Sequence, residues 1–213
     1  AKTAGFACAF VSNGNATPEV LDFLRPWIVA YKIDLKGFTE KFYKEVVHGE
    51  LKPVLDALVT IRAQGVWNEI VYLVVPTLND SDEQFQGLSR WVKANLGMDV
   101  PVHFTRFHPE YLLKNLPPTP VSTLEQCRKI AMDAGVRYVY AGNVPMHPGE
   151  NTYCHSCREE LIRRDRGSGQ RCRREKRQGN DRMPLHLRHR RLRKIHRSAA
   201  KRPMVTRSNS STA

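Results

Sequence analysis

Long apolar runs are missing from this chain of 213 residues. No stretch approaches the roughly 18 consecutive apolar residues that a membrane-spanning helix needs, so we expect no such helix. Residues 1–5 contain neither an initiator Met nor the apolar core of a secretory signal. We therefore expect a cytoplasmic protein. We also expect that this sequence is part of a longer protein and begins just before a strand.

Acidic side chains and aromatic rings are scarce in the last part of the chain. Residues 166–213 contain 16 Lys and Arg but only 2 Asp and Glu, whereas residues 1–165 contain 18 and 19. The net charge of +13 therefore comes from this tail, and Tyr153 is the last aromatic residue. A segment so charged and so poor in large apolar groups cannot offset its conformational entropy by burial, which predicts a disordered, Arg-rich tail over 166–213.

Three interpretations of this tail stay open. Its basic runs could bind nucleic acid through the phosphates, although it has no aromatic ring for stacking on bases. It could also be a solvated tail without a partner. Because charge, Arg content and aromatic content all change near Asp165, we favour an out-of-frame or otherwise unnatural terminus over a nucleic-acid-binding segment.

The remainder of the chain alternates between two kinds of apolar pattern. Helix patterns begin near Thr17, Pro53, Ser81 and Ser122, and the last three stop at glycines. Strands separated by helices of this length are typical of βαβ units around a parallel sheet, which predicts an α/β fold with right-handed crossovers. The strand-like runs are 6–12, 27–34, 69–75, 102–107 and 136–141.

Polar residues follow each expected strand. The carboxyl ends of parallel strands form the active face of barrels and of open α/β sheets alike, so five such ends predict a shared site. The alternative is that these loops are polar only because tight turns require it. Asp34 and Lys36 fit that alternative poorly, because charges at the end of the mostly apolar run 28–33 are costly to bury unless they are paired or liganded. The strand-end segments are 12–15, 34–37, 76–80, 106–109 and 142–143.

Five stretches carry a resemblance to a known family. In order, they are VSNGNATPEVLDFLRPWIVAYKIDLKGF, LVVPTLNDSDEQ, VHFTRFHPEY, PPTPVSTLEQCRKIAMDAGVRYVYAGNVP and HPGENTYCHSC. The chain resembles the radical S-adenosylmethionine (radical SAM) enzyme of the AmmeMemoRadiSam system, which is similar to the activating enzymes of pyruvate formate-lyase and other glycyl-radical enzymes. This resemblance, over residues 8–165, implies that 1–153 form the C-terminal part of a partial (β/α) barrel of the TIM type, without its first βα units. Residues 154–165 would begin a zinc-ribbon-like segment.

The resemblance also implies a cofactor chemistry. In the family, a CxxxCxxC motif holds a 4Fe–4S cluster that binds S-adenosylmethionine, and electron transfer releases a 5′-deoxyadenosyl radical that abstracts hydrogen from the substrate. Val71 stands where glycyl-radical activators have an arginine, so that contact is not carried over. Memo-like and AMMECR-like proteins are the implied partners, and the sequence assigns neither a substrate nor a catalytic residue. By position, the S-adenosylmethionine site would include Ser12, Asn13, Asp34, Lys36 and His108.

Cysteine is too sparse for that cluster. None of Cys8, Cys127, Cys154, Cys157 and Cys172 belongs to a CxxxCxxC motif, so we expect this polypeptide alone to bind no cluster. We expect Cys8 on a strand and Cys127 on a helix to be small buried hydrophobes. Cys154 and Cys157 have zinc-knuckle spacing, and a zinc site that they form with Cys172 and a tail histidine is the less favoured alternative.

Two hypotheses about function follow. The first is part of a radical SAM enzyme, inactive by itself, whose missing units leave an open apolar sheet edge at 6–11 that invites association. The second is a non-catalytic module that holds a protein or nucleic-acid partner with the barrel remnant or the basic tail. A CxxxCxxC motif encoded in frame ahead of Ala1 would favour the first.

Overall fold

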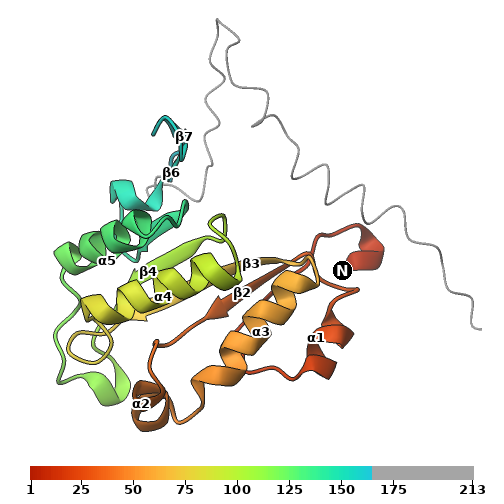
Figure 1. The fold of residues 1–213 in the computed structure, drawn as a ribbon, viewed down its shortest axis with the longest axis horizontal. Coiled ribbons are helices and arrows are strands. Elements are labelled where there is room, and N and C mark those ends of the chain that lie inside the picture. Colours follow the sequence, from red (N-terminus) through yellow and green to blue (C-terminus); the bar gives the residue numbers. More distant parts are fainter. Residues whose placement is uncertain (165–213) are drawn as a thin grey trace, which may run out of the picture. The chain divides into compact units, whose positions relative to one another are not determined.

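A five-stranded parallel sheet forms the centre of the protein (Figure 1). The computed structural model describes residues 1–164, so the expected disorder of 166–213 lies outside the described residues. The strands are in sequence order across the sheet, which confirms the predicted α/β fold. They are β1 (Ala9–Ser12), β2 (Ala30–Asp34), β3 (Trp67–Val74), β4 (Val102–Arg106) and β5 (Val139–Gly142), and a separate antiparallel hairpin joins β6 (Thr152–Tyr153) to β7 (Glu160–Ile162).

Four helices connect the strands, and they begin and end close to the predicted residues. Thr17 and Ser81 cap their helices by accepting a hydrogen bond from a backbone N–H of the first turn. No helix of the described part is long and apolar enough to cross a membrane. The connecting helices are α1 (Pro18–Leu24), α3 (Leu51–Ala63), α4 (Asp82–Asn95) and α5 (Val121–Asp133).

Several short helical segments lie in the loops. The sequence pattern did not predict α2 (Glu40–Phe42), which continues directly into a π-helical turn, η2 (Tyr43–Val47). Three single 3₁₀ turns complete the described secondary structure: η1 (Lys2–Ala4), η3 (Tyr111–Leu113) and η4 (Pro148–Glu150).

The two faces of the sheet differ in composition. Residues of β3 alternate between buried and partly exposed, because successive side chains of a strand point to opposite faces. Ile70, Tyr72 and Phe104 are fully buried in the core that the sheet forms with the helices. Sequential strands joined by right-handed crossovers place all their helices on one side, as Figure 1 shows. The opposite face, called the open face below, carries Lys32 and Glu69.

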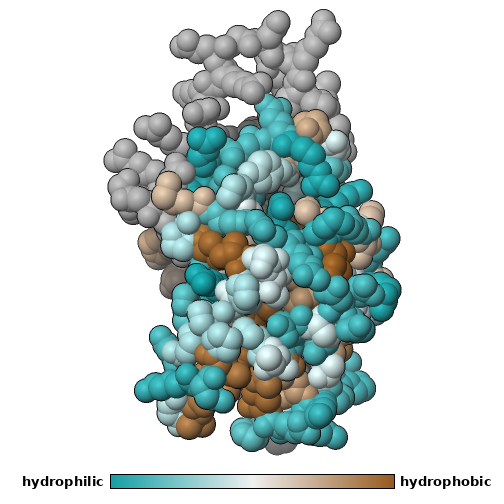
Figure 2. All heavy atoms as spheres, turned by 90° about the vertical axis from the view of Figure 1, so that its left-hand side faces the viewer, coloured by the Kyte–Doolittle hydropathy of each residue, from teal (hydrophilic) through white to brown (hydrophobic). Residues whose placement is uncertain are grey.

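Apolar exposure is concentrated at one edge of the sheet. Phe6 is 68% and Val11 60% exposed, which confirms the expected uncovered edge at β1. Phe23 and Trp27, in and after α1, are exposed beside it. The side of the molecule where α5 lies is instead mostly hydrophilic, with separate apolar patches (Figure 2).

Candidate functional site

The five parallel strands end at the same edge of the sheet. Their register pairs Ser12 with Ile33, and Asp34 with Val71. The loops that follow the strands therefore meet along the carboxyl edge, as the sequence predicted. In parallel α/β sheets this edge is where ligands bind.

Asp34 and Lys36 form an ion pair at this edge. The Lys36 Nζ lies 3.3 Å from the Asp34 Oδ2, and the two side chains are 38% and 36% exposed, with the lysine first. The charges that end β2 are thus satisfied by each other and by water, and both remain accessible. The backbone N–H of Lys36 donates to the Tyr43 hydroxyl (3.2 Å), and burial of this tyrosine raises its pKa. The unpredicted helical turn η2 therefore supports the candidate site.

Asn79 fixes the loop from the other side. Its fully buried side chain accepts a hydrogen bond from the Val75 N–H at 2.6 Å. Its amide nitrogen donates to the carbonyls of Lys36 (2.8 Å) and Leu73 (2.9 Å). One side chain thus joins the end of β3 to the loop after β2. Sequence reasoning placed Asn79 in a polar loop but did not find this role.

Thr119 has a similar role one strand farther along. Its hydroxyl donates to the Val74 carbonyl (2.6 Å) and accepts from the Phe107 N–H (2.9 Å). The Arg106 Nε donates to the Thr119 carbonyl at 2.8 Å. These bonds set the direction in which the chain leaves β4, and they place His108 at the carboxyl edge with its ring exposed.

Ser12 and Asn13 complete the predicted set. Ser12 lies at the same edge, but its hydroxyl is hydrogen-bonded to the Tyr31 hydroxyl (2.8 Å) and accepts from the Gly14 N–H (3.0 Å). Asn13 is exposed, and its side-chain oxygen accepts from the Asn15 N–H (3.1 Å). The structure thus brings all five predicted residues to one edge, and it engages the Ser12 hydroxyl in the local turn.

A second polar group lies on the open face of the sheet. The Glu69 carboxylate accepts from the Trp67 indole N–H (3.0 Å), and its Oε2 lies 3.0 Å from the His103 Nε2. The hydrogen bond from His103 lowers the pKa of Glu69; the Trp67 bond and the charge of Lys32 act in the same direction, against burial. His103 also stacks on Tyr140, with ring centroids 4.7 Å apart. The register places His103 beside Val71 and Val71 beside Asp34, so this group lies on the same face as Asp34, two strands away.

Sequence reasoning missed the Glu69–His103 pair. The sequence signal was weak, because polar and apolar residues alternate at the start of β4, whereas β3 is apolar from Ile70 onward and only its burial alternates. That alternation identifies which side chains share a face, but it does not give the register that brings position 69 to position 103.

The cysteines have mixed outcomes. Cys127 is fully buried, as predicted, and burial raises the pKa of its thiol. The prediction for Cys8 is wrong, because this residue precedes β1 and is partly exposed. The backbone N–H groups of Cys157 and Ser156, and the Cys157 thiol, lower the pKa of Cys154.

The zinc alternative stays a prediction. Residues 1–164 contain no cluster of three or more His, Cys, Asp or Glu side chains that could hold a metal ion. Cys172, which that alternative requires, lies outside the described residues.

Comparison with solved structures defines the fold class. A domain of the pyruvate-formate lyase-activating enzyme from Bacteroides vulgatus matches 67% of this chain and 84% of that domain, with a TM-score of 0.59 and 15% identity. A radical SAM methyltransferase from Sphaerobacter thermophilus matches 65% of this chain and 41% of that protein, with a TM-score of 0.53 and 15% identity. The chain therefore has the fold of a radical SAM partial barrel.

At the level of sequence, the chain is similar to the uncharacterized protein MJ0808 of Methanocaldococcus jannaschii. The two are 42% identical over 164 residues, which are 77% of this chain and 48% of that protein. The chain thus spans about half the length of this relative. No protein-family model matches the chain.

Proposed function

We propose that this chain is part of a radical SAM enzyme of the AmmeMemoRadiSam type. The observation that carries the proposal is the carboxyl edge of the sheet, which bears the Asp34–Lys36 pair after β2 and His108 after β4, in a fold of the radical SAM class. The substrate could be a protein or a small molecule. On the sequence resemblance alone, we propose Memo-like and AMMECR-like proteins as its partners and the cytoplasm as its location.

A 4Fe–4S cluster does not fit the described part of this chain. Such a cluster needs three thiolates within reach of one another. Cys127 is enclosed in the core, Cys8 lies before the opposite edge strand, and Cys154 and Cys157 supply only two thiols. We therefore assign the cluster to residues outside 1–164 and derive no step of the reaction from it.

S-adenosylmethionine fits the carboxyl edge better. Its amino, carboxylate and ribose groups need both donors and acceptors, and the edge offers the Asp34 carboxylate, the Lys36 ammonium, the His108 ring and the Asn13 amide. Asp34, Lys36, His108 and Asn13 would hold S-adenosylmethionine, which would supply radical chemistry for hydrogen abstraction only together with a cluster bound outside 1–164.

The chain's own contribution is to bind and to orient. Asp34 would accept hydrogen bonds from the ligand, and Lys36 would donate to it, each held by the other across 3.3 Å. Asn79 keeps the loop in place through the Lys36 carbonyl. On the open face, the Glu69 carboxylate and the His103 ring are hydrogen-bonded at 3.0 Å, which adds a polar pair nearer the amino ends of β3 and β4.

The test uses the complete reading frame that contains this chain. We expect it to encode a CxxxCxxC motif ahead of Ala1, and the purified protein, kept anaerobic and reduced, to convert S-adenosylmethionine to 5′-deoxyadenosine. Asp34→Asn and Lys36→Gln should slow this cleavage at least tenfold without changing the electron paramagnetic resonance spectrum of the cluster.

Asp56→Asn is the matched control. Asp56 is also paired with a lysine, at 2.5 Å, but it lies exposed on α3, so its variant should cleave at the normal rate. Normal cleavage in the Asp34 and Lys36 variants would show that the pocket is misplaced. A reading frame without the motif, and a protein without cleavage activity, would instead favour the non-catalytic binding module.

A further inference from the structure

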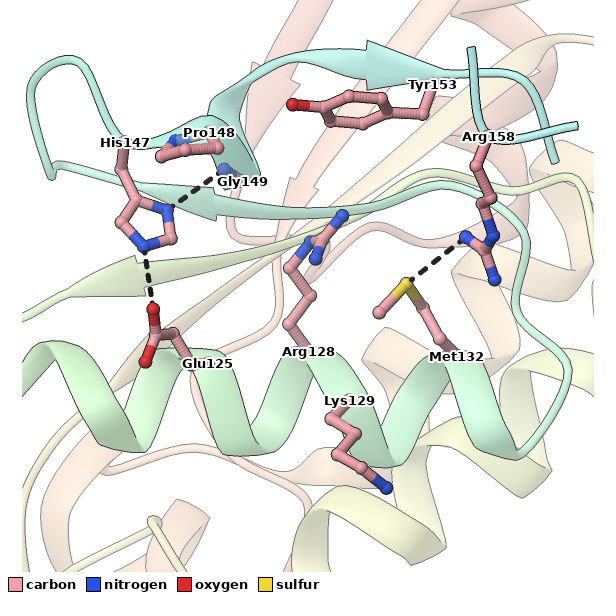
Figure 3. Close-up of a pocket in the computed structure, with 9 residues that line it drawn as sticks. All are labelled: Glu125, Arg128, Lys129, Met132, His147, Pro148, Gly149, Tyr153 and Arg158. Atoms are coloured by element: carbon pink, nitrogen blue, oxygen red, sulfur yellow. Dashed lines mark hydrogen bonds and ion pairs between the residues drawn. The ribbon is translucent and has the colours of Figure 1, made fainter. Parts of the chain in front are cut away.

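A cavity of about 520 Å³ lies between α5 and the segment that follows β5, where Pro148, Gly149 and Tyr153 line it (Figure 3). Its wall includes Arg128, whose Nε donates to the carbonyl of Val139, the first residue of β5 (2.9 Å). Its volume is within the range of small-molecule sites in proteins. None of the residues placed in the S-adenosylmethionine site lines it.

Two arginines of the cavity have no acidic partner within residues 1–164. Arg128 rises from α5, and Arg158 comes from the turn after β6 (Figure 3). Apart from the Nε bond to Val139, the Arg128 guanidinium makes no hydrogen bond within that range, and the Arg158 Nη1 contacts only the Met132 sulfur, at 3.7 Å. Thioether sulfur is a weak acceptor, so most of the N–H groups of both forks remain available.

The electrostatics of Arg128 are unfavourable in the free protein. Burial lowers the pKa of its guanidinium, and the positive charge of Arg158 lowers it further, while Tyr153 acts in the opposite direction. Arg128 is partly buried and Arg158 is exposed, so the desolvated charge of Arg128 in particular is costly unless an anion compensates it.

The other charged groups of the cavity do not supply that anion. The Glu125 carboxylate lies 3.2 Å from the His147 Nε2 at the rim. Lys129 also lines the cavity, but its ammonium pairs with Asp133 at 2.7 Å and points away from Arg128 and Arg158 (Figure 3). The charged side chains that line the cavity therefore do not neutralise Arg128 and Arg158, and both can attract an anionic ligand.

We propose that this cavity binds a phosphoryl group of a small phosphate monoester, held between Arg128 and Arg158. Guanidinium forks match the geometry of phosphate oxygens, and a dianion matches two unpaired cations better than a monoanionic carboxylate does. The cavity is larger than a free phosphate needs, so the rest of the monoester would lie along Tyr153. The proposal does not depend on the radical SAM assignment.

The experiment titrates the full chain with inorganic phosphate, glycerol 3-phosphate and acetate. Shifts of the Arg Nε–H signals and of the Tyr153 ring by NMR identify binding at this cavity, whereas anions that bind the basic tail leave these signals unmoved. We expect glycerol 3-phosphate to bind most tightly, then phosphate, and acetate at least tenfold more weakly than phosphate.

Three variants decide the outcome. Arg128→Gln and Arg158→Gln should each weaken phosphate binding about tenfold or more, because each removes a charge-assisted pair. Lys129→Gln removes the same charge from a side chain that points away, and it should change the affinity less than twofold. Arg128→Lys keeps the positive charge but loses the paired N–H groups of the guanidinium, so it tests phosphate recognition without removing the charge. Thermal unfolding of each variant would detect a folding defect.

Two results would overturn the proposal. One is the absence of any shift of the Arg128, Arg158 or Tyr153 signals at high phosphate concentration. The other is an equal loss of affinity in the Lys129 and arginine variants, which would mean diffuse attraction to a positive surface.

Discussion

Replacing Asn79 by alanine tests whether one buried amide holds the candidate site together. The substitution removes three hydrogen bonds at once and leaves the Val75 N–H and the carbonyls of Lys36 and Leu73 without their partner. The Asn79 side chain is fully buried, so water does not readily replace it. An orphaned buried donor or acceptor costs about 1–3 kcal/mol, and the carbonyls can partly use other donors, so we expect a loss of about 3 kcal/mol.

Urea denaturation measures this loss. With a slope of about 2 kcal/mol per molar urea, the midpoint should fall by about 1.5 M. Asn95→Ala is the matched control: its amide also donates to a backbone carbonyl, that of Trp91 at 2.9 Å, but it is exposed at the end of α4. The control should lose less than about 0.5 kcal/mol.

Hydrogen exchange adds a local measurement to the global one. The Val75 N–H should exchange much faster in Asn79→Ala than in the unchanged protein, and the N–H of Lys36, which is bonded to Tyr43, should follow if the loop moves as a unit. A midpoint shift below about 0.3 M, with unchanged exchange at Val75, would refute the idea that Asn79 organises this edge.

Three further predictions concern other parts of the fold. The pKa of Glu69 is lowered in the folded state, so its ionised carboxylate stabilises the fold above the unfolded pKa of about 4.3. Glu69→Gln should therefore be less stable than the unchanged protein above this pH, and the difference should disappear as the pH falls through the folded pKa. Urea unfolding at several pH values measures this difference. Gly37→Ala should cost about 1–3 kcal/mol, because its Cβ would lie 2.4 Å from the Phe42 ring, whereas Gly49→Ala, with nothing within 4 Å, should be close to neutral. Light scattering should detect oligomers of the chain, and Val11→Lys should reduce them by placing a charge on the exposed edge strand; a monodisperse monomer before the change would contradict the open-edge interpretation.

Most of the fold could be predicted from the sequence because its elements depend on local patterns. The apolar stripe and the cap at Ser81 define α4, and the mostly apolar run 69–75 indicates β3. The π-helical turn at Tyr43–Val47 escaped prediction, because no short-range pattern distinguishes one extra residue per turn from an ordinary helix.

The support of the candidate site could not be predicted in the same way. Asn79 bonds to a carbonyl 43 residues away, and Thr119 bonds to one 45 residues away. Every residue has a backbone carbonyl, so the sequence does not indicate which carbonyl will accept a hydrogen bond from a given buried side chain. The positions of Asp34 and Lys36, in contrast, were predictable, because charges that end an apolar strand are rare and must be satisfied.

The unequal surface of the sheet links the fold to the proposed function. On the open face, polar groups such as Lys32 and Glu69 keep the surface compatible with water and with a polar ligand. At β1 this pattern breaks down, because seven of the twelve exposed large hydrophobic residues of the described chain lie between Phe6 and Val29. An edge strand with free backbone groups and an apolar flank is suited to pair with a further strand. In the longer enzyme that we propose, a preceding βα unit would cover this edge, and the apolar surface there would become part of the barrel core.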